Sequence, residues 1–172
     1  MLLGCGERAD KPSHGRIDAV ANASQEMSGP SLFSRERLAP ALALLRAKQP
    51  GKLLRLEIRP RELVMQAEDA RTPGSVVELH YRDGKVGEPE HAALRGKGLL
   101  AENLFELDGV KLDAIPELTR VAVQRVDSES GRADLVLVRR GLPQSDEIRL
   151  RVYVTSPRQS GYMDADRTGQ PL

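Results

Sequence analysis

The chain has 172 residues with nearly balanced charge, 26 basic against 25 acidic, for a net charge of +1. No segment carries the basic excess that binding to nucleic-acid phosphates requires, and there is no tryptophan to stack on bases. No apolar run approaches the roughly 20 residues of a membrane-spanning helix. The only cysteine, Cys5, excludes an internal disulfide and a multi-cysteine metal site. We therefore expect one globular protein that binds neither nucleic acid nor a cofactor.

The first 30 residues are predicted to form a flexible tether. They are rich in Gly, Ser, Ala, Asn and charged residues and poor in large apolar ones. At their start, Leu2-Leu3-Gly4-Cys5 places an apolar residue three positions before the cysteine and a small residue directly before it. This pattern resembles the lipobox of bacterial lipoproteins.

The resemblance implies cleavage before Cys5 and attachment of a lipid to it, with Gly6 favouring the outer membrane. A complete signal has an apolar region of roughly 7–15 residues before the cleavage site. Because only four residues precede Cys5, we expect either an upstream start codon or a trimmed N-terminus. The alternative is a cytoplasmic protein whose first residues match the pattern by accident.

Residues 31–90 are predicted to form a first unit, a helix followed by strands. Leu38, Leu42 and Leu45 recur at helical spacing. Ser34 is the expected N-cap, and residues 49–51 end the helix. Since proline is tolerated only near the first turn, Pro40 places the expected start of the helix proper near Leu38. Alternation of apolar and charged residues then predicts strands, with Asp83-Gly84 as a hairpin turn, over 54–59, 63–67, 77–81 and 85–86.

Residues 91–172 are predicted to hold a linker and a second unit with the same order of elements. The linker, residues 87–109, is expected to pack on the core through Leu99-Leu100 and Leu104-Phe105. Asp113 is the expected cap of a helix that ends at Ser130-Gly131. Strands are predicted after it at 133–140, 147–154 and 161–165.

This order predicts an α+β protein of two helix-plus-antiparallel-meander units, with helices packed on one face of the sheet. Short matches between the halves, such as Leu32-Phe33 with Leu104-Phe105, indicate an internal duplication. A single domain whose helices start alike is the alternative. In element order alone, the arrangement is similar to the beta-lactamase-inhibitor-like and PepSY domains of bacterial envelope proteins. That similarity carries no residue motif and transfers no site.

No catalytic motif is present, so we expect no enzyme. His14, His80 and His91 lie in three different segments, and His80 is expected to be an exposed strand residue. Residues 164–169 have the oxygen and glycine spacing of half a calcium loop, but no carboxylate stands at the twelfth position. A turn stabilised by aspartate side chains is therefore the favoured interpretation, and no metal is expected.

Arginine supplies twenty of the 26 basic residues. Strand alternation places several arginines opposite the apolar residues, and Arg and Tyr dominate the energetics of protein interfaces. The predicted surface for an acidic protein partner consists of Arg55, Arg59, Arg149, Arg151, Tyr153, Arg158 and Tyr162. The alternative is that a GC-rich genome encodes Arg in place of Lys and that neighbours such as Glu57 and Glu78 pair with these side chains.

Together these features predict a non-enzymatic protein anchored by lipid on Cys5 to the outer membrane and facing the periplasm. Its expected role is to bind another protein, as an inhibitor or as an immunity protein against a secreted antibacterial effector. The alternative is a structural or assembly lipoprotein of the bacterial envelope.

Overall fold

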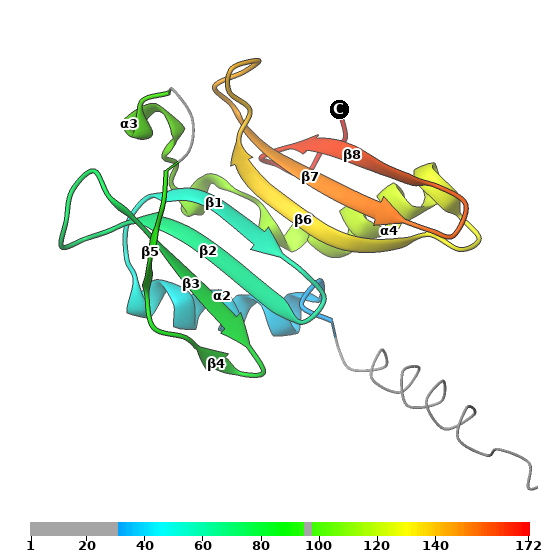
Figure 1. Ribbon diagram of the computed structural model, residues 1–172. Helices are drawn as coiled ribbons and strands as arrows, with labels where there is room; N and C mark the ends of the chain where they lie inside the picture. Colours follow the sequence, from blue (N-terminus) through cyan, green and yellow to red (C-terminus); the bar gives the residue numbers. More distant parts are fainter. Residues whose placement is uncertain (1–30, 95–97) are drawn as a thin grey trace, which may run out of the picture. The chain divides into compact units, whose positions relative to one another are not determined.

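The computed structural model describes residues 31–94 and 98–172, so Cys5 and the predicted tether lie outside the described residues. Residues 31–172 form one compact unit built on an eight-stranded antiparallel sheet (Figure 1). Its elements are α2 (Arg35–Lys48), β1 (Leu53–Ile58), β2 (Glu62–Glu68), β3 (Val76–Arg82), β4 (Lys85–Val86), β5 (Glu90–Ala92), α3 (Leu100–Asn103), two 3-10 turns η2 (Leu107–Gly109) and η3 (Leu112–Ala114), α4 (Ile115–Asp127), β6 (Arg132–Arg140), β7 (Ile148–Thr155) and β8 (Ser160–Asp166).

Two meanders share the sheet. The strand order is β4-β3-β2-β1-β6-β7-β8, with β5 also paired to β3, so the meanders join through their first strands. At this seam Leu56 lies opposite Val138 and Ile58 opposite Val136. In the predicted order, each half is a helix followed by strands: β1–β5 in the first half and β6–β8 in the second. The predicted α+β class with an antiparallel sheet is confirmed.

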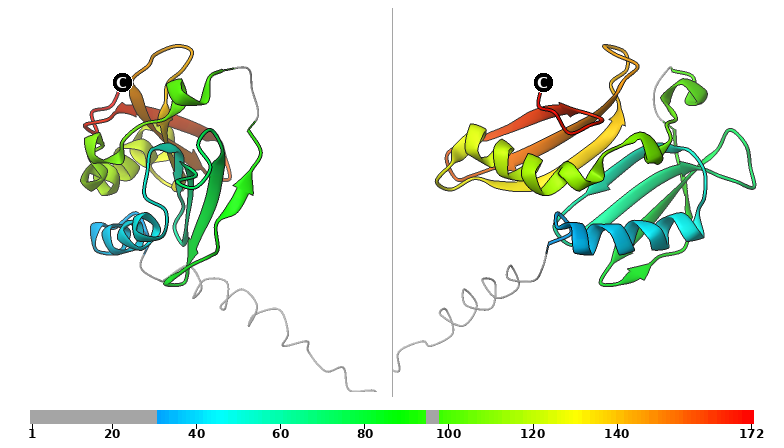
Figure 2. Two further views of the ribbon diagram at one scale, coloured as in Figure 1. Left: turned by 90° about the vertical axis from the view of Figure 1, so that its left-hand side faces the viewer. Right: turned by 180° about the vertical axis from the view of Figure 1, so that it is seen from behind.

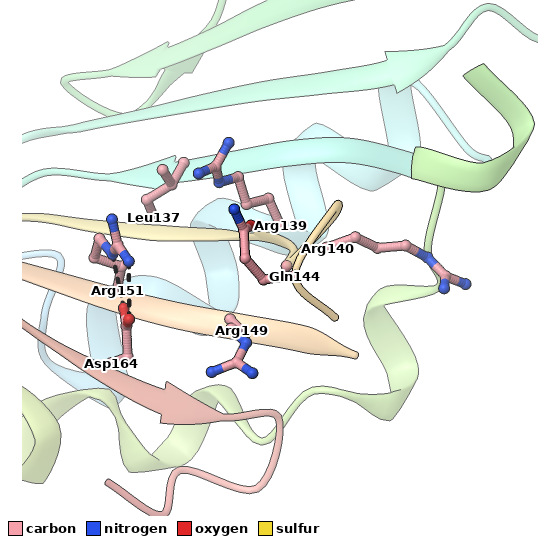
Figure 3. A pocket seen from close by; sticks show the side chains of 8 residues that line it. Leu137, Arg139, Arg140, Gln144, Arg149, Arg151 and Asp164 are labelled. Carbon is pink, nitrogen blue, oxygen red and sulfur yellow. Dashed lines mark hydrogen bonds and ion pairs between the residues drawn. The ribbon is translucent and has the colours of Figure 1, made fainter. Parts of the chain in front are cut away.

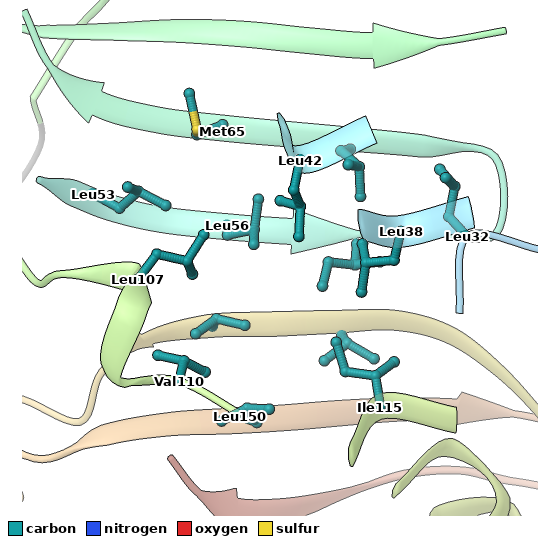
Figure 4. Packing of buried hydrophobic residues seen from close by; sticks show 14 of the residues in the cluster. Leu32, Leu38, Leu42, Leu53, Leu56, Met65, Leu107, Val110, Ile115 and Leu150 are labelled. Atoms are coloured by element: carbon teal, nitrogen blue, oxygen red, sulfur yellow. The ribbon is translucent and has the colours of Figure 1, made fainter. Parts of the chain in front are cut away.

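One face of the sheet is apolar and carries the core. Strand register aligns the fully buried side chains of Leu56 and Met65, and those of Val136 and Val152. Side chains of both long helices join the same hydrophobic cluster (Figure 4), namely Leu38, Ala41, Leu42 and Leu45 of α2 and Ile115, Leu118 and Ala122 of α4. Figure 2 shows α2 and α4 on the same side of the sheet. In the described residues, neither α2 nor α4 covers the opposite face.

A β-bulge changes which leucines of β1 are buried. The register shifts between Leu53 and Arg55, so the chain contains one extra residue there and the alternation slips by one position. Leu53 and Leu56 are therefore both buried, while Leu54 is only half-buried. The prediction that Leu54 alternates with Leu56 on one face is wrong for this reason.

The two long helices begin differently from the prediction. α2 starts at Arg35 and contains Pro40, which lies on its exposed side. Burial of the leucines on the other side maintains the helix although Pro40 lacks the N–H of one helical hydrogen bond. α4 follows a 3-10 turn, and its cap position is Ala114. Asp113 forms an ion pair with Arg35 at 3.2 Å and is not the predicted cap of α4.

The connections were predicted in part. Asp83 and Gly84 both have positive φ, 52° and 80°, and turn the β3–β4 hairpin as expected. The segment predicted as a linker contains the unpredicted strand β5 and buries Phe105, which bridges Leu53. Leu99 is 66% exposed, so the Leu104-Phe105 pair packs on the core but Leu99 does not.

We expect Leu56→Ala to lower the free energy of unfolding by about 2–5 kcal/mol, because it opens a cavity in a fully packed core beside the seam. Urea unfolding followed by far-ultraviolet circular dichroism measures this change. The matched control is Leu44→Ala in α2, where the side chain is 49% exposed, and we expect a change within about 0.5 kcal/mol. Equal effects of the two substitutions would contradict the placement of Leu56.

Candidate functional site

The face of the sheet opposite the helices carries polar and charged side chains. Arg55 of β1 lies opposite Arg139 of β6, which lies opposite Arg149 of β7. Three arginines from adjacent strands therefore form one row, which we name the arginine row. The whole surface is referred to as the open face and consists of Arg55, Glu57, Glu62, Gln66, Glu78, His80, Arg82, Leu137, Arg139, Arg149, Arg151, Tyr153, Tyr162 and Asp164.

On the β1–β3 half of the open face, charges are compensated. Arg55 pairs with Glu57 at 3.1 Å and approaches Glu78 at 3.9 Å. His80 bonds Glu62 through Nδ1 at 3.1 Å and Glu78 through Nε2 at 3.0 Å. The hydrogen bond to Glu62 raises the pKa of His80 above its ordinary value, and burial only partly opposes this. His80 lies on the predicted side of its strand, but its ring is hydrogen-bonded to two carboxylates.

On the β7–β8 part, an arginine is fixed between a carboxylate and an aromatic ring. Arg151 donates to both oxygens of Asp164 at 2.7 and 2.8 Å, and its guanidinium carbon lies 4.0 Å from the centre of the Tyr162 ring. The Tyr153 and Tyr162 rings are 6.2 Å apart. We name these four residues the tyrosine cluster. Its ion pair and ring contacts hold it in shape before any partner binds.

A pocket of about 410 Å³ lies between the arginine row and this cluster (Figure 3). Four arginines line it, against one carboxylate that is already bonded to Arg151. The lining, which we name the arginine pocket, is Leu137, Arg139, Arg140, Gly141, Gln144, Arg149, Arg151 and Asp164. Within residues 31–94 and 98–172, neither Arg139 nor Arg149 forms an ion pair. The pocket is therefore strongly positive.

The pKa of Asp164 is lowered in this positively charged pocket. The hydrogen bond from Arg151 is the main cause that lowers it, and the charges of Arg149 and Arg139 lower it further. Figure 3 shows the guanidinium groups of Arg139 and Arg149 turned away from each other. Like charges on directly opposite residues repel, which accounts for this arrangement.

Of the seven predicted binding residues, five belong to the open face: Arg55, Arg149, Arg151, Tyr153 and Tyr162. Arg59 follows β1 in the turn and bonds Glu57 at 3.1 Å. The pairing of Arg55 and Arg59 with Glu57 matches the alternative interpretation stated above. For Arg149 the described residues provide no such carboxylate.

Arg158 of the predicted surface is paired within the protein. It lies in the β7–β8 turn and binds the buried Asp127 at the end of α4 at 2.6 Å, and Glu129 at 2.9 Å. The hydrogen bond from Arg158 holds the pKa of Asp127 far below its usual range. Arg158 thus fixes the helix end to the strand turn. The sequence alone gave no sign of this contact, because the two residues come together only in the tertiary structure.

Arg139 was missed, although a signal for it exists. Val136 and Val138 are core residues of β6, so alternation assigns Leu137 and Arg139 to the other side. What the sequence could not supply was the pairing of β6 with β1, which completes the arginine row. Gln144 and Arg140, in or near the β6–β7 turn, were missed because their position depends on how that turn folds.

The segment with calcium-loop spacing is a turn. The Asp166 carboxylate accepts hydrogen bonds from the Thr168 amide at 2.8 Å, the Thr168 hydroxyl at 2.7 Å and the Gln170 amide at 3.0 Å. Gly169 has a φ of 84° in this turn, a conformation that favours glycine. The predicted turn interpretation is what the structure has. In the described ranges no three His, Cys, Asp or Glu residues are grouped to hold a metal.

Comparisons with known proteins bear on the fold alone. No family model and no curated protein matches the chain. A similar solved structure is that of a putative lipoprotein from Clostridium difficile 630, with a TM-score of 0.59 and 11% sequence identity over 85% of this chain and 94% of that chain. The two proteins share a fold. None of the helices in the described residues is both long enough and apolar enough to cross a membrane.

We expect the stability of the protein to fall as the pH rises through the titration of His80. Because the native pKa of His80 is raised, its protonated ring stabilises the folded state. That contribution is complete below the unfolded pKa of about 6.5 and is lost above the higher native value. Urea unfolding between about pH 6 and pH 8 should show the loss, and His80→Gln should reduce it. The exposed His91 of β5 provides the control His91→Gln, and equal pH dependence in both variants would contradict the assignment.

Proposed function

We propose that the protein is a non-enzymatic, lipid-anchored protein of the bacterial envelope that binds another protein through the open face of its sheet. The observation that carries the proposal is the arginine row. Arg55, Arg139 and Arg149 come from three adjacent strands. Within the described residues, the last two have no carboxylate partner.

The row is unfavourable for the isolated fold. Like charges directly opposite each other on neighbouring strands destabilise a sheet. Arginines without a carboxylate partner gain no ion-pair energy that would offset this repulsion. A partner with complementary charge would relieve the repulsion on binding. This supports an interaction surface and not a merely solvated face.

The tyrosine cluster next to the row supplies a second interface feature. Tyr162 is 57% exposed, while Arg151 beneath it is fixed by Asp164. An exposed aromatic ring on a rigid support loses little conformational entropy when it is buried. Tyr and Arg are also the residue types that most often dominate the binding energy of interfaces.

Within this proposal, the protein is an inhibitor or an immunity protein against a secreted antibacterial effector. A preformed binding face on a continuous sheet suits tight binding with little rearrangement. The lipobox-like Leu2-Leu3-Gly4-Cys5 supports a lipid anchor, and the fold shared with a putative lipoprotein agrees with it. The outer membrane and a domain facing the periplasm are proposed from Gly6, which follows Cys5. A structural or assembly lipoprotein is the alternative, and enzymatic assays of the partner separate the two.

Lipidation is tested at Cys5. In the natural host, we expect the wild-type protein to incorporate labelled palmitate and Cys5→Ser to lose the label, because the thiol is the attachment site. Ser13→Ala, in the same segment, is the control that should keep the label. A wild-type protein that stays unlabelled and fractionates with the cytosol would refute the anchor.

Partner binding is tested by site-specific photocrosslinking. A crosslinking amino acid at Tyr162 on the open face should capture one partner in the envelope fraction, whereas the same group at the exposed Leu44 of α2 should not. With the purified partner, Tyr162→Ala should weaken binding at least about tenfold, the effect typical of a central aromatic residue. Equal capture at both positions, or unchanged affinity of Tyr162→Ala, would contradict the open face as the binding surface. Loss of the partner's enzymatic activity on binding would identify an inhibitor, and unchanged activity the assembly alternative.

A further inference from the structure

We infer that the arginine pocket binds carboxylates from an acidic segment of the partner protein, with Arg139 and Arg149 as the two residues that engage them. The inference rests on the proposed protein-binding function and adds the chemistry that the partner must present.

The four arginines that line the pocket have different roles. Arg151 is bonded to both oxygens of Asp164. Arg140 donates to two backbone carbonyls, those of Leu104 at 3.0 Å and Asp146 at 2.7 Å. Figure 3 shows its guanidinium pointing away from the others. This leaves Arg139 and Arg149 with their donors available to an incoming anion.

The β6–β7 turn packs beside Arg149, one of these two residues. Gly141 of this turn lies against the Arg149 side chain, since an added Cβ would lie 2.8 Å from its Nε. The turn is closed by backbone bonds from Gln144 and Ser145 to the Gly141 carbonyl, at 3.1 and 3.2 Å. This hydrogen-bonded turn forms the wall of the pocket beside Arg149.

The spacing of the cations favours several carboxylates over one compact anion. Neighbouring strands lie about 4.8 Å apart, so the row from Arg55 through Arg139 to Arg149 extends over about 10 Å. In the orientation that Figure 3 shows, the guanidiniums of Arg139 and Arg149 turn apart, so one phosphate group would engage both only after a side chain turned. Glutamates one helical turn apart, with Cβ atoms about 5–6 Å from each other, match the spacing of about 4.8 Å between neighbouring arginines of the row.

Guanidinium geometry points to the same ligand. The planar fork of arginine binds a carboxylate through two parallel hydrogen bonds, which a lysine ammonium cannot do. The neighbouring Tyr162 and Leu137 provide apolar contact for the stems of acidic side chains. An anionic membrane surface would meet the arginines equally well but would not need this pocket.

The experiment compares two synthetic helical peptides by isothermal titration calorimetry at low salt. One carries glutamates four positions apart, and the matched peptide carries glutamines. We expect the protein to bind the glutamate peptide and not the glutamine peptide. The double variant Arg139→Ala/Arg149→Ala should weaken that binding about 100-fold or more, since each charged hydrogen-bonding group contributes about 1.5 kcal/mol and every ~1.4 kcal/mol is tenfold. Arg149→Lys, which keeps the charge without the fork, should bind more weakly than wild type.

Control measurements separate this result from loss of charge or of folding. Arg37→Ala on the exposed side of α2 removes one positive charge away from the pocket and should bind the peptide as wild type does, whereas the single variant Arg149→Ala, which removes the same number of charges, should not. The double variant should unfold at the wild-type urea concentration or a higher one, because it removes a like-charge pair.

Other outcomes would overturn the inference. The inference fails if inorganic phosphate, or vesicles of phosphatidylglycerol and phosphatidylcholine, bind with the same dependence on Arg139 and Arg149 while the glutamate peptide does not. The site would then be an anion or membrane site of another kind. If the partner captured at Tyr162 binds the double variant with unchanged affinity, the pocket assignment fails and the protein-binding function stands. If no partner is captured but the peptide binds through both arginines, the pocket stands and the proposed function fails.

Discussion

The pairing of β1 with β6 is the contact on which the rest of the fold depends. Each meander alone would have a short sheet and one helix, with much of its apolar surface exposed. At the seam, Leu56 and Val138 are adjacent on the core face, while Arg55 and Arg139 are adjacent on the open face. The same register thus creates a continuous hydrophobic surface for both helices and a row of like charges on the other side. Burial of the aliphatic side chains outweighs the repulsion, because the exposed arginines are screened by water.

What the sequence could predict is set by the range of the interactions involved. The strands and the Asp83-Gly84 hairpin follow from alternation and turn chemistry within a few residues, and they occur close to their predicted positions. The bulge at Leu54 and the short strand β5 depend on pairing with distant segments. Neither has a local signal strong enough to reveal it.

The same distinction holds for the candidate site. Alternation along one strand was enough to place Arg149, Arg151 and Tyr153 on the open face, because it depends only on the strand being half-buried. Arg139 required knowledge of which strand lies beside β1, and Arg158 required knowledge of which helix end lies beside its turn. Partner choice for a long, flexible cation is a tertiary property. Composition and periodicity therefore indicated the kind of surface but not its centre.

Charge is distributed unequally between the two halves of the open face, so the two halves would act differently on an acidic partner. In the β1–β3 half, Glu62 and Glu78 are matched by His80, Arg82 and Arg55, so this half presents carboxylates that already have partners. In the β6–β7 half, the cations are in excess. An acidic segment that slid toward β2 and β3 would meet cations that are already paired with glutamates, so the misplaced complex would lose the attraction of the arginine pocket. The compensated half thus contributes specificity without contributing attraction, and it confines a partner's carboxylates to the side of the seam where the arginine pocket lies.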